Sequence, residues 1–168
     1  MKKIIMILSL IFLFVLPSLA LAQSNTLVNV STEVVSSFAL SKVSDVAFGE
    51  MTANMTRAIG EGDMGAGKVL CAGVRDAPVA FWASSSTGST GGDVTSTITL
   101  SNGTATLTLS SVTIYDINSN LSATGKPLNT HLDSFGNGGV EVGGTLNVPD
   151  GTTAGTYTGS AYVFAEYD

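Results

Sequence analysis

The sequence has very few of the side chains that most often carry chemistry. It contains one cysteine, Cys71, and one histidine, His131. The absence of clustered Cys and His residues argues against a zinc site, and the absence of a G-x-S-x-G motif argues against a hydrolase nucleophile. His131 stands in a polar stretch and is expected to be a solvated loop residue. We therefore predict no catalytic residue, no cofactor and no metal, and a protein that is not an enzyme.

A single cysteine also excludes an internal disulfide. Cys71 lies in an apolar stretch with Val69, where a free cysteine normally behaves as a small buried hydrophobic side chain. A disulfide between two copies of the chain is the alternative.

Charged residues are scarce as well, at 12% of the sequence. Without the first 22 residues, five basic and thirteen acidic side chains remain, a net charge of −8. This acidic balance excludes nucleic acid and anionic lipid as expected partners.

No apolar run is long enough to span a bilayer, which takes about 20 residues. The chain begins with basic Met1–Lys3, followed by apolar Ile4–Val15, Pro17 and an A-x-A site at Ala20–Ala22. This order is typical of a secretory signal peptide. We predict a signal peptide over residues 1–22, export through the inner membrane to the periplasm and then to the cell surface or beyond, and no membrane insertion after cleavage.

No convincing long helix is indicated either. Short alternating runs recur at a spacing of roughly ten residues, as in antiparallel sandwiches. The clearest pair, 95–101 and 104–110, flanks Asn102-Gly103, which predicts a two-residue hairpin turn with positive φ at both residues. The fold class expected is all-β, an antiparallel immunoglobulin-like β-sandwich.

The other segments are assigned in the same way. Residues 50–67 are expected to be a flexible loop with one helical turn near 54–58, and residues 118–137 a polar connection. Trp82 is expected to pack in the core, with a sugar-stacking platform as the alternative. Further strands are expected at residues 43–48, 68–73, 77–84, 112–117 and 140–148, the last with a bulge at Gly143-Gly144.

The mature N-terminus carries a regular alternation. Its apolar-side residues are Val28, Val30, Thr32 and Val34, and Phe38 and Leu40 continue the pattern. Such a strand could pair within its own domain or be donated to a neighbour, because the alternation serves either use. We assign residues 23–40 to this candidate donor strand and residues 41–168 to the sandwich domain.

The C-terminal stretch, residues 155–168, is rich in residues that suit a pleated surface. One parity is almost wholly apolar: Tyr157, Ala161, Val163, Ala165 and Tyr167. We predict one long central strand with these positions facing the core.

Two family resemblances rest on these residues. Residues 142–149, Gly155-Thr-Tyr-Thr-Gly159 and the final Tyr167 resemble a bacterial family of secreted, pilin-like proteins (domain of unknown function 4402), as does Val46-Ala-Phe-Gly49. Gly155 and Tyr167 also stand where chaperone–usher pilus subunits, including common-pilus major subunits, have a Gly and a penultimate Tyr. The cysteine pair of many such pilins is absent.

The resemblance implies an incomplete sandwich whose groove receives a strand first from a periplasmic chaperone and then, at an outer-membrane usher, from the next subunit. Such donation gives a head-to-tail homopolymer. Residues expected in the assembly strand are Gly155, Tyr157, Gly159, Val163 and Tyr167. A structural subunit of a surface fibre, acting in adhesion or biofilm, is the first hypothesis. A secreted, monomeric binding module for a glycan or protein, using Trp82 and the 118–137 connection, is the second.

Overall fold

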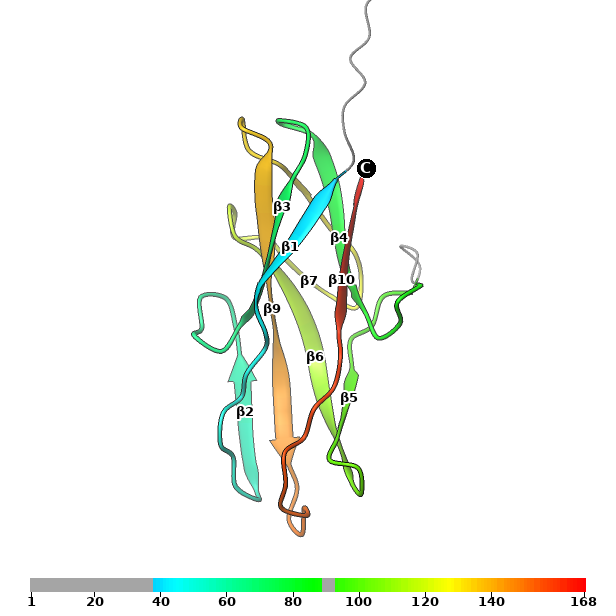
Figure 1. Ribbon diagram of the computed structural model, residues 1–168. Coiled ribbons are helices and arrows are strands. Elements are labelled where there is room, and N and C mark those ends of the chain that lie inside the picture. The colour runs from blue at the N-terminus through cyan, green and yellow to red at the C-terminus, as the bar shows by residue number, and fades with distance from the viewer. Residues whose placement is uncertain (1–37, 89–92) are drawn as a thin grey trace, which may run out of the picture. The chain divides into compact units, whose positions relative to one another are not determined.

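The computed structural model describes residues 38–88 and 93–168, and this part of the chain consists of ten strands joined by turns and irregular segments, without a helix (Figure 1). The expected signal peptide and the candidate donor residues Val28, Val30, Thr32 and Val34 lie outside the described residues. Residues 35–168 group as one compact unit.

Two antiparallel sheets make up this unit. The larger sheet has seven strands; the path through it is β1-β3-β9-β6-β5, with β2 added beside β9 and β7 beside β6. Its strands are β1 (Ala39–Ser44), β2 (Met55–Ile59), β3 (Gly67–Ala72), β5 (Ile98–Ser101), β6 (Thr106–Asp116), β7 (Ser122–Thr124) and β9 (Asn137–Val148). The smaller sheet has the order β10-β4-β8, with β4 (Pro78–Ser84), β8 (Leu128–His131) and β10 (Tyr162–Tyr167).

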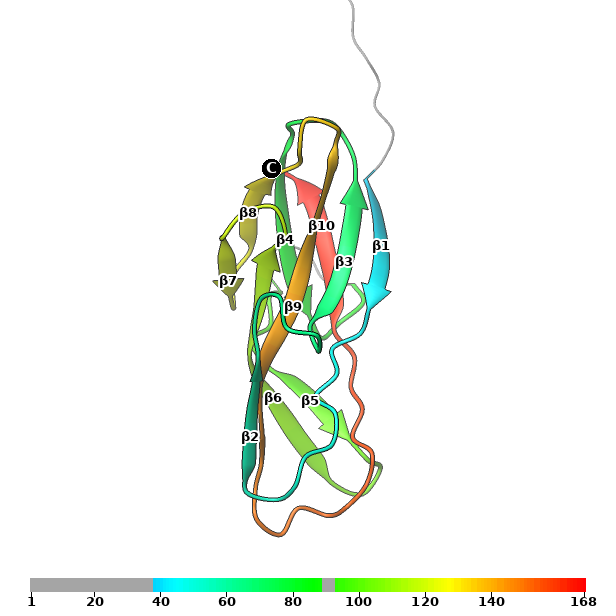
Figure 2. The same cartoon turned by 90° about the vertical axis from the view of Figure 1, so that its left-hand side faces the viewer.

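The two sheets pack face to face over one apolar core, which confirms the predicted all-β antiparallel sandwich (Figure 2). Alternation puts Val79, Phe81 and Ala83 of β4 on the core side. They meet side chains from the long strands of the larger sheet, among them Leu109, Val112, Ile114, Val140 and Val142.

A bulge in β6 explains how one strand serves the core along its whole length. Leu107 and Leu109 point inward at odd positions, and Val112 and Ile114 at even ones. The parity changes at Ser111, which has a φ of 52°, where the pairing with β9 shifts register. One extra residue in a strand moves all later side chains to the other face.

The β5–β6 hairpin is confirmed, but its turn is shifted by one residue. Ile98 pairs with Leu109 and Leu100 with Leu107, and the Asn102 N–H donates to the Ala105 carbonyl at 3.2 Å. The two central residues are therefore Gly103, with a φ of 88°, and Thr104. The Asn102 side chain instead accepts hydrogen bonds from the backbone N–H groups of Thr104 and Ala105, so it caps the turn from one position earlier than predicted.

Three local predictions are wrong. Residues 55–59 form strand β2 and not a helical turn, because they pair with the end of β9, Met55 opposite Val148. The 118–137 connection contains β7 and β8, which pair with β6 and β4. Gly143 and Gly144 do not break β9, which is continuous over twelve residues; they leave room for the neighbouring backbone at Ile59 and Ser110.

The two chain ends also differ from expectation. The predicted short strand over residues 43–48 is not formed. Instead β1 runs from Ala39 to Ser44, so it continues past residue 40, at which the N-terminal strand was predicted to end. The C-terminal strand is shorter than predicted, Tyr162–Tyr167, and lies at the edge of its sheet beside β4 rather than at its centre. Its parity is as predicted, since Val163 and Ala165 pack against the core.

Candidate functional site: an open apolar groove

The smaller sheet covers only part of the larger one. β4, β8 and β10 lie over the half that contains β1, β3 and β7, whereas β2, β5 and the far ends of β6 and β9 face only irregular chain (Figures 1 and 2). That chain consists of residues 45–54 on one side and residues 149–161 on the other. The core side chains of this half are consequently covered by two separate segments with a furrow between them.

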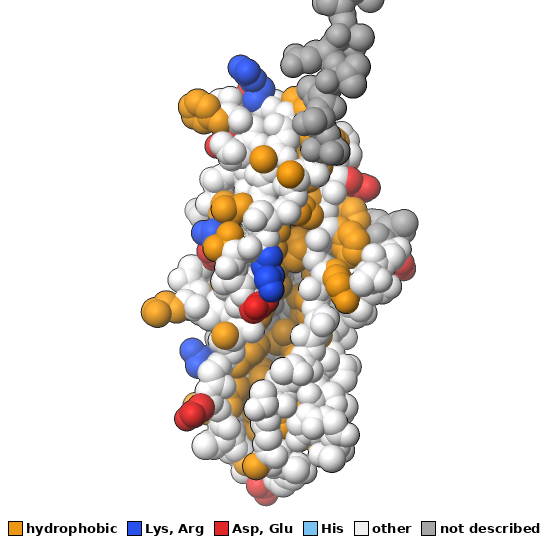
Figure 3. Space-filling view, viewed as in Figure 1, with side chains coloured by type: hydrophobic (Ala, Val, Ile, Leu, Met, Phe, Trp, Pro, Cys, Tyr) orange, Lys and Arg blue, Asp and Glu red, His pale blue; other side chains and the backbone are white. Residues whose placement is uncertain are grey.

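This furrow is a groove of about 1480 Å³. A space-filling view shows apolar side chains exposed along its length (Figure 3). Its floor is built by β5, β6 and β9. Leu100 is half-buried there, whereas the other floor residues are only 3–7% exposed: Ile98, Leu107, Leu109, Leu146 and Val148. The volume exceeds the roughly 300–1,000 Å³ of ordinary small-molecule pockets, so the groove is large enough for a segment of polypeptide.

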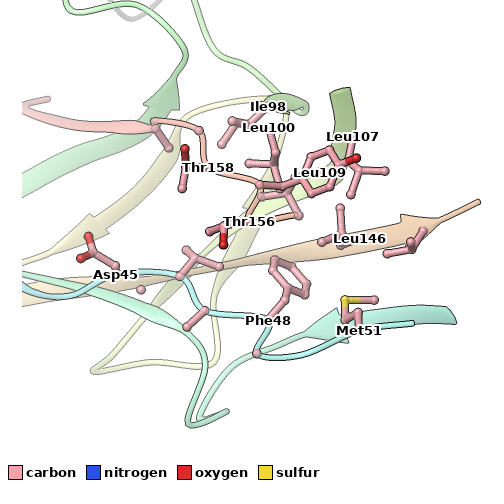
Figure 4. A pocket seen from close by; sticks show the side chains of 18 of the residues that line it. Asp45, Phe48, Met51, Ile98, Leu100, Leu107, Leu109, Leu146, Thr156 and Thr158 are labelled. Carbon is pink, nitrogen blue, oxygen red and sulfur yellow. The ribbon is translucent and has the colours of Figure 1, made fainter. Parts of the chain in front are cut away.

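One wall of the groove is the segment after β1. Phe48 and Met51 point from it toward Leu146 on the floor (Figure 4). The wall is held by two hydrogen bonds outside the groove: the Ala47 N–H donates to the Gly65 carbonyl at 2.9 Å, and the Arg57 guanidinium donates to the Phe48 carbonyl at 2.6 Å. These bonds fasten the wall to the outer side, and at its end the Asn54 N–H donates to the carbonyl of the floor residue Val148 at 2.7 Å.

The opposite wall contains three of the predicted assembly residues. Gly155, Tyr157 and Gly159 all line the groove. This wall is fastened to β5, since Thr158 and Ser101 exchange two backbone hydrogen bonds, of 2.8 and 3.0 Å. The Tyr157 hydroxyl donates to the Thr153 carbonyl at 2.8 Å, so its ring is fixed against the floor.

A second, smaller hollow of about 350 Å³ adjoins the groove between β1 and β10 and extends it in that direction. Val69, Ala161 and Val163 line both parts. β1 pairs on one side with β3, and β10 pairs on one side with β4. Within residues 38–88 and 93–168, the edges of β1 and β10 that face the groove have no strand partner. Ala161 has the inward parity of the C-terminal stretch and still remains exposed. The two unpaired edges thus face each other, with Val69, Ala161 and Val163 between them.

An aromatic contact closes the narrow end of the groove. The ring of Phe38, just before β1, meets the ring of Tyr167 edge-on at a centroid distance of 4.9 Å. The Tyr167 hydroxyl accepts a hydrogen bond from the backbone N–H of Val74 at 2.8 Å. The predicted assembly residue Tyr167 thus ties the start of β1 to the end of β10, and the groove is open at its other end, beside Met51 and Val148.

Cys71 lies away from the groove, on the core side of β3. Only 5% of it is exposed, as predicted for a small buried hydrophobic residue. Burial, and then the negative charges of Asp116 and Asp133, raise the pKa of its thiol to about 11, against a weaker opposing effect of the Gly138 backbone.

We expect Cys71 to resist thiol reagents in the folded protein at pH 8 and to react only on unfolding, since the thiolate is the reactive form. The folded-state pKa is raised, so the contribution of Cys71 to stability is complete below pH 9 and is lost as the pH rises toward 11. Comparing urea denaturation of wild type and Cys71→Ala between pH 7 and 11 measures this. An identical pH slope in the two proteins would contradict the expectation.

Asp116 is a buried acid that the sequence did not single out. It is 2% exposed, and its carboxylate accepts hydrogen bonds from the Asn118 N–H at 2.9 Å, the Ser119 hydroxyl at 2.7 Å and the Thr130 hydroxyl. These neutral donors connect the end of β6 to β8.

The remaining candidate residues are placed as follows. Trp82 is 3% exposed and its ring stacks on Phe164 at a centroid distance of 5.6 Å; it is buried rather than offered as a platform. His131 is exposed, but on strand β8 and not in a loop. No group of His, Cys, Asp and Glu residues suited to a metal ion occurs in the described parts of the chain. A search of the same residues finds no helix capable of crossing a membrane.

Sequence reasoning missed the wall formed by Phe48 and Met51 and the floor as a continuous surface. Two large apolar residues in a stretch rich in turn-forming residues were the only hint of the wall, and they did not show which side chains face inward. The groove is not apolar throughout: Lys42 and Asp45 also line it, and they form an exposed ion pair with each other at 2.8 Å.

Comparison with known families matches residues 38–167 to a family described as Domain of unknown function (DUF4402). The match covers most of the chain, and the protein belongs to this family, as the resemblance in its C-terminal half predicted. No curated protein and no solved structure gives a significant match. The finer likeness to chaperone–usher pilins stays a prediction.

Proposed function

We propose that the protein is a non-enzymatic structural subunit of a bacterial surface fibre, acting in adhesion or biofilm. In this proposal the groove is filled by residues 24–36 of a second copy. The single observation that carries it is the apolar groove between the unpaired edges of β1 and β10. An added strand would gain main-chain hydrogen bonds on both sides, and its alternate side chains would fill the floor.

The segment containing Val28, Val30 and Val34 is suited to this place. Its apolar side chains alternate with Asn29, Ser31 and Glu33, so one face can enter the groove while the other remains in water. Fully burying three valines contributes roughly 4.5–9 kcal/mol, at about 1.5–3 kcal/mol each.

The direction of the strands favours a donor from another copy. β1 and β10 run in opposite directions on the two sides of the groove (Figures 1 and 2). To lie in the groove of its own domain, the segment would have to run parallel to β10. The chain would then have to reverse direction within Val35-Ser36-Ser37, before β1 begins. These residues include no Gly or Asn, which tight reversals favour. A donor from a neighbour runs antiparallel to β10 and requires no turn.

An open apolar groove with two free edges is an aggregation hazard before assembly. By the family resemblance, a periplasmic chaperone would cover it and an outer-membrane usher would exchange the chaperone for the next subunit. Export to the periplasm and then to the cell surface, which the sequence predicts, is required for this route. For the alternative, a monomeric binding module, the buried Trp82 offers no contact surface.

Concentration-dependent assembly tests the proposal. The mature chain, residues 23–168, is expected to form head-to-tail oligomers by light scattering, whereas residues 37–168 should remain monomeric and bind a labelled peptide of residues 23–36. A control peptide with Val30 and Val34 replaced by Asp should not bind. A mature chain that stays monomeric at high concentration, with no binding of either peptide, would favour the binding module.

A further inference from the structure

Phe135 is an aromatic ring held out from the surface on a fixed loop. It is 85% exposed and stands between β8 and β9. The Asp133 carboxylate accepts hydrogen bonds from the N–H groups of Phe135 and Asn137, both at 2.8 Å, and the Gly136 N–H donates to the Asp133 carbonyl at 2.9 Å. Since the backbone on both sides of Phe135 is held by these hydrogen bonds, docking through this side chain requires no ordering of the loop.

The loop that carries Phe135 is connected by hydrogen bonds and ring contacts to Phe38, the first residue that the structure describes. The Gly73 N–H donates to the Gly136 carbonyl at 2.8 Å, and the adjacent Val74 binds the Tyr167 hydroxyl, whose ring contacts Phe38. We call this surface, formed by Phe38, Tyr167 and residues 73–77 and 132–136, the exit face. It lies at the end of the sandwich opposite the turns at 49–54 and 149–155, which surround the open end of the groove (Figure 1).

The length of chain between two copies limits how far apart they can lie. This step rests on the proposed function, in which Val34 of one copy lies at the open end of the next copy's groove. Phe38 remains packed on its own domain. Four Cα–Cα steps separate the two residues, and four residues extend over at most about 14 Å. The exit face of one copy and the open end of the groove of the next must therefore lie within about 14 Å of each other.

We propose that Phe135 of one copy packs against the open end of the groove of the next copy, on Met51 and Met55. Both methionines line the groove, and Met55 is 44% exposed beside Val148 at the end of β9. Methionine side chains adapt to the shape of a partner and make favourable contacts with aromatic rings. An exposed, rigid aromatic residue that becomes desolvated on docking is typical of an interface hot spot. The subunits then contact each other through a second surface, separate from the inserted strand.

The test uses the mature chain, residues 23–168, and compares Phe135→Ser with Met64→Ser. Met64 is also fully exposed, at 106%, but it lies in the 60–66 loop, away from the exit face, so it is the matched control for lost surface hydrophobicity. Both variants should melt at the wild-type temperature. We expect Phe135→Ser to raise the concentration required for assembly at least about 10-fold, and Met64→Ser to leave it unchanged.

The same assay with Met55→Ser, alone and together with Phe135→Ser, tests the contact itself. If the two side chains touch, the double variant should require no higher concentration for assembly than the poorer single variant. If they do not touch, the fold increases in the required concentration should multiply. Wild-type assembly by Phe135→Ser, equal losses for Phe135→Ser and Met64→Ser, or multiplicative losses in the double variant would each overturn the inference while the proposed function stands. Failure of the wild-type chain to assemble would overturn both.

Discussion

Moving residues 23–36 from the N-terminus to a position after Asp168 is expected to raise the melting temperature of the monomer by at least about 10 °C over the chain that lacks them. The C-terminus lies beside Phe38 at the closed end of the groove, since Tyr167 contacts that residue. After a short flexible turn, a strand grafted there can run back between β1 and β10, antiparallel to β10. The apolar surface it buries is worth several kcal/mol, and each kcal/mol raises the melting temperature of a domain of this size by about 2–8 °C.

Differential scanning calorimetry of three chains measures this effect: the truncated chain, the grafted chain and a grafted chain with Val28, Val30 and Val34 replaced by Ser. The serine graft retains the length and the backbone hydrogen bonds but loses the side chains that fill the floor. It should therefore recover only a small part of the gain. If the truncated chain melts cooperatively at the temperature of the grafted chain, the sandwich is complete without a donor and the fibre proposal fails.

Replacing Ala161 with Asp is expected to block assembly without harming the folded domain. Ala161 is exposed in the empty groove and lines both of its parts, so the carboxylate is solvated in the monomer. An inserted strand would cover it, and a short Asp side chain cannot extend back to water as Lys or Arg can. Lys42 lines the same parts of the groove, but it is already paired with Asp45, so the added carboxylate would be buried without a cation of its own. That costs several kcal/mol, which corresponds to at least about a 100-fold weaker association.

The neighbouring residue supplies the control. Ser160 is exposed and does not line the groove, so Ser160→Asp adds the same charge one residue away on the other face. Its assembly should equal that of the wild type, and the melting temperatures of both variants should lie close to the wild-type value. Equal assembly by Ala161→Asp and Ser160→Asp, measured by light scattering and peptide binding, would exclude the groove as the assembly site.

Much of the fold follows from local sequence patterns. The β5–β6 hairpin and the parity of the C-terminal strand could be predicted, since each depends on alternation over a few residues. The strands in residues 55–59 and 122–131 could not. Their short sequences acquire strand structure by pairing with β9, β6 and β4, which are distant in the chain, so tertiary contacts override a weak local preference.

Of the two walls of the groove, the sequence singled out residues on the C-terminal one only. The sequence indicated Tyr157, Val163 and Tyr167 as residues of an assembly strand, and they lie along the groove or at its closed end. The opposite wall, with Phe48 and Met51, was not predicted, because irregular segments carry no periodicity to reveal which side chains face inward. The bulge at Ser111, which determines the residues on the floor, leaves no local signal at all in the sequence.

The opposed directions of β1 and β10 have a mechanical consequence. A strand inserted between them would lie along both edges, and a pull on the fibre would act along that strand's own axis. All of its backbone hydrogen bonds would then bear the load together in shear, instead of breaking one after another as they do when a strand is peeled from a sheet edge. A chain joined in this way would yield to tension only when an entire strand slipped at once, so its resistance to flow would exceed what the modest affinity of each single contact suggests.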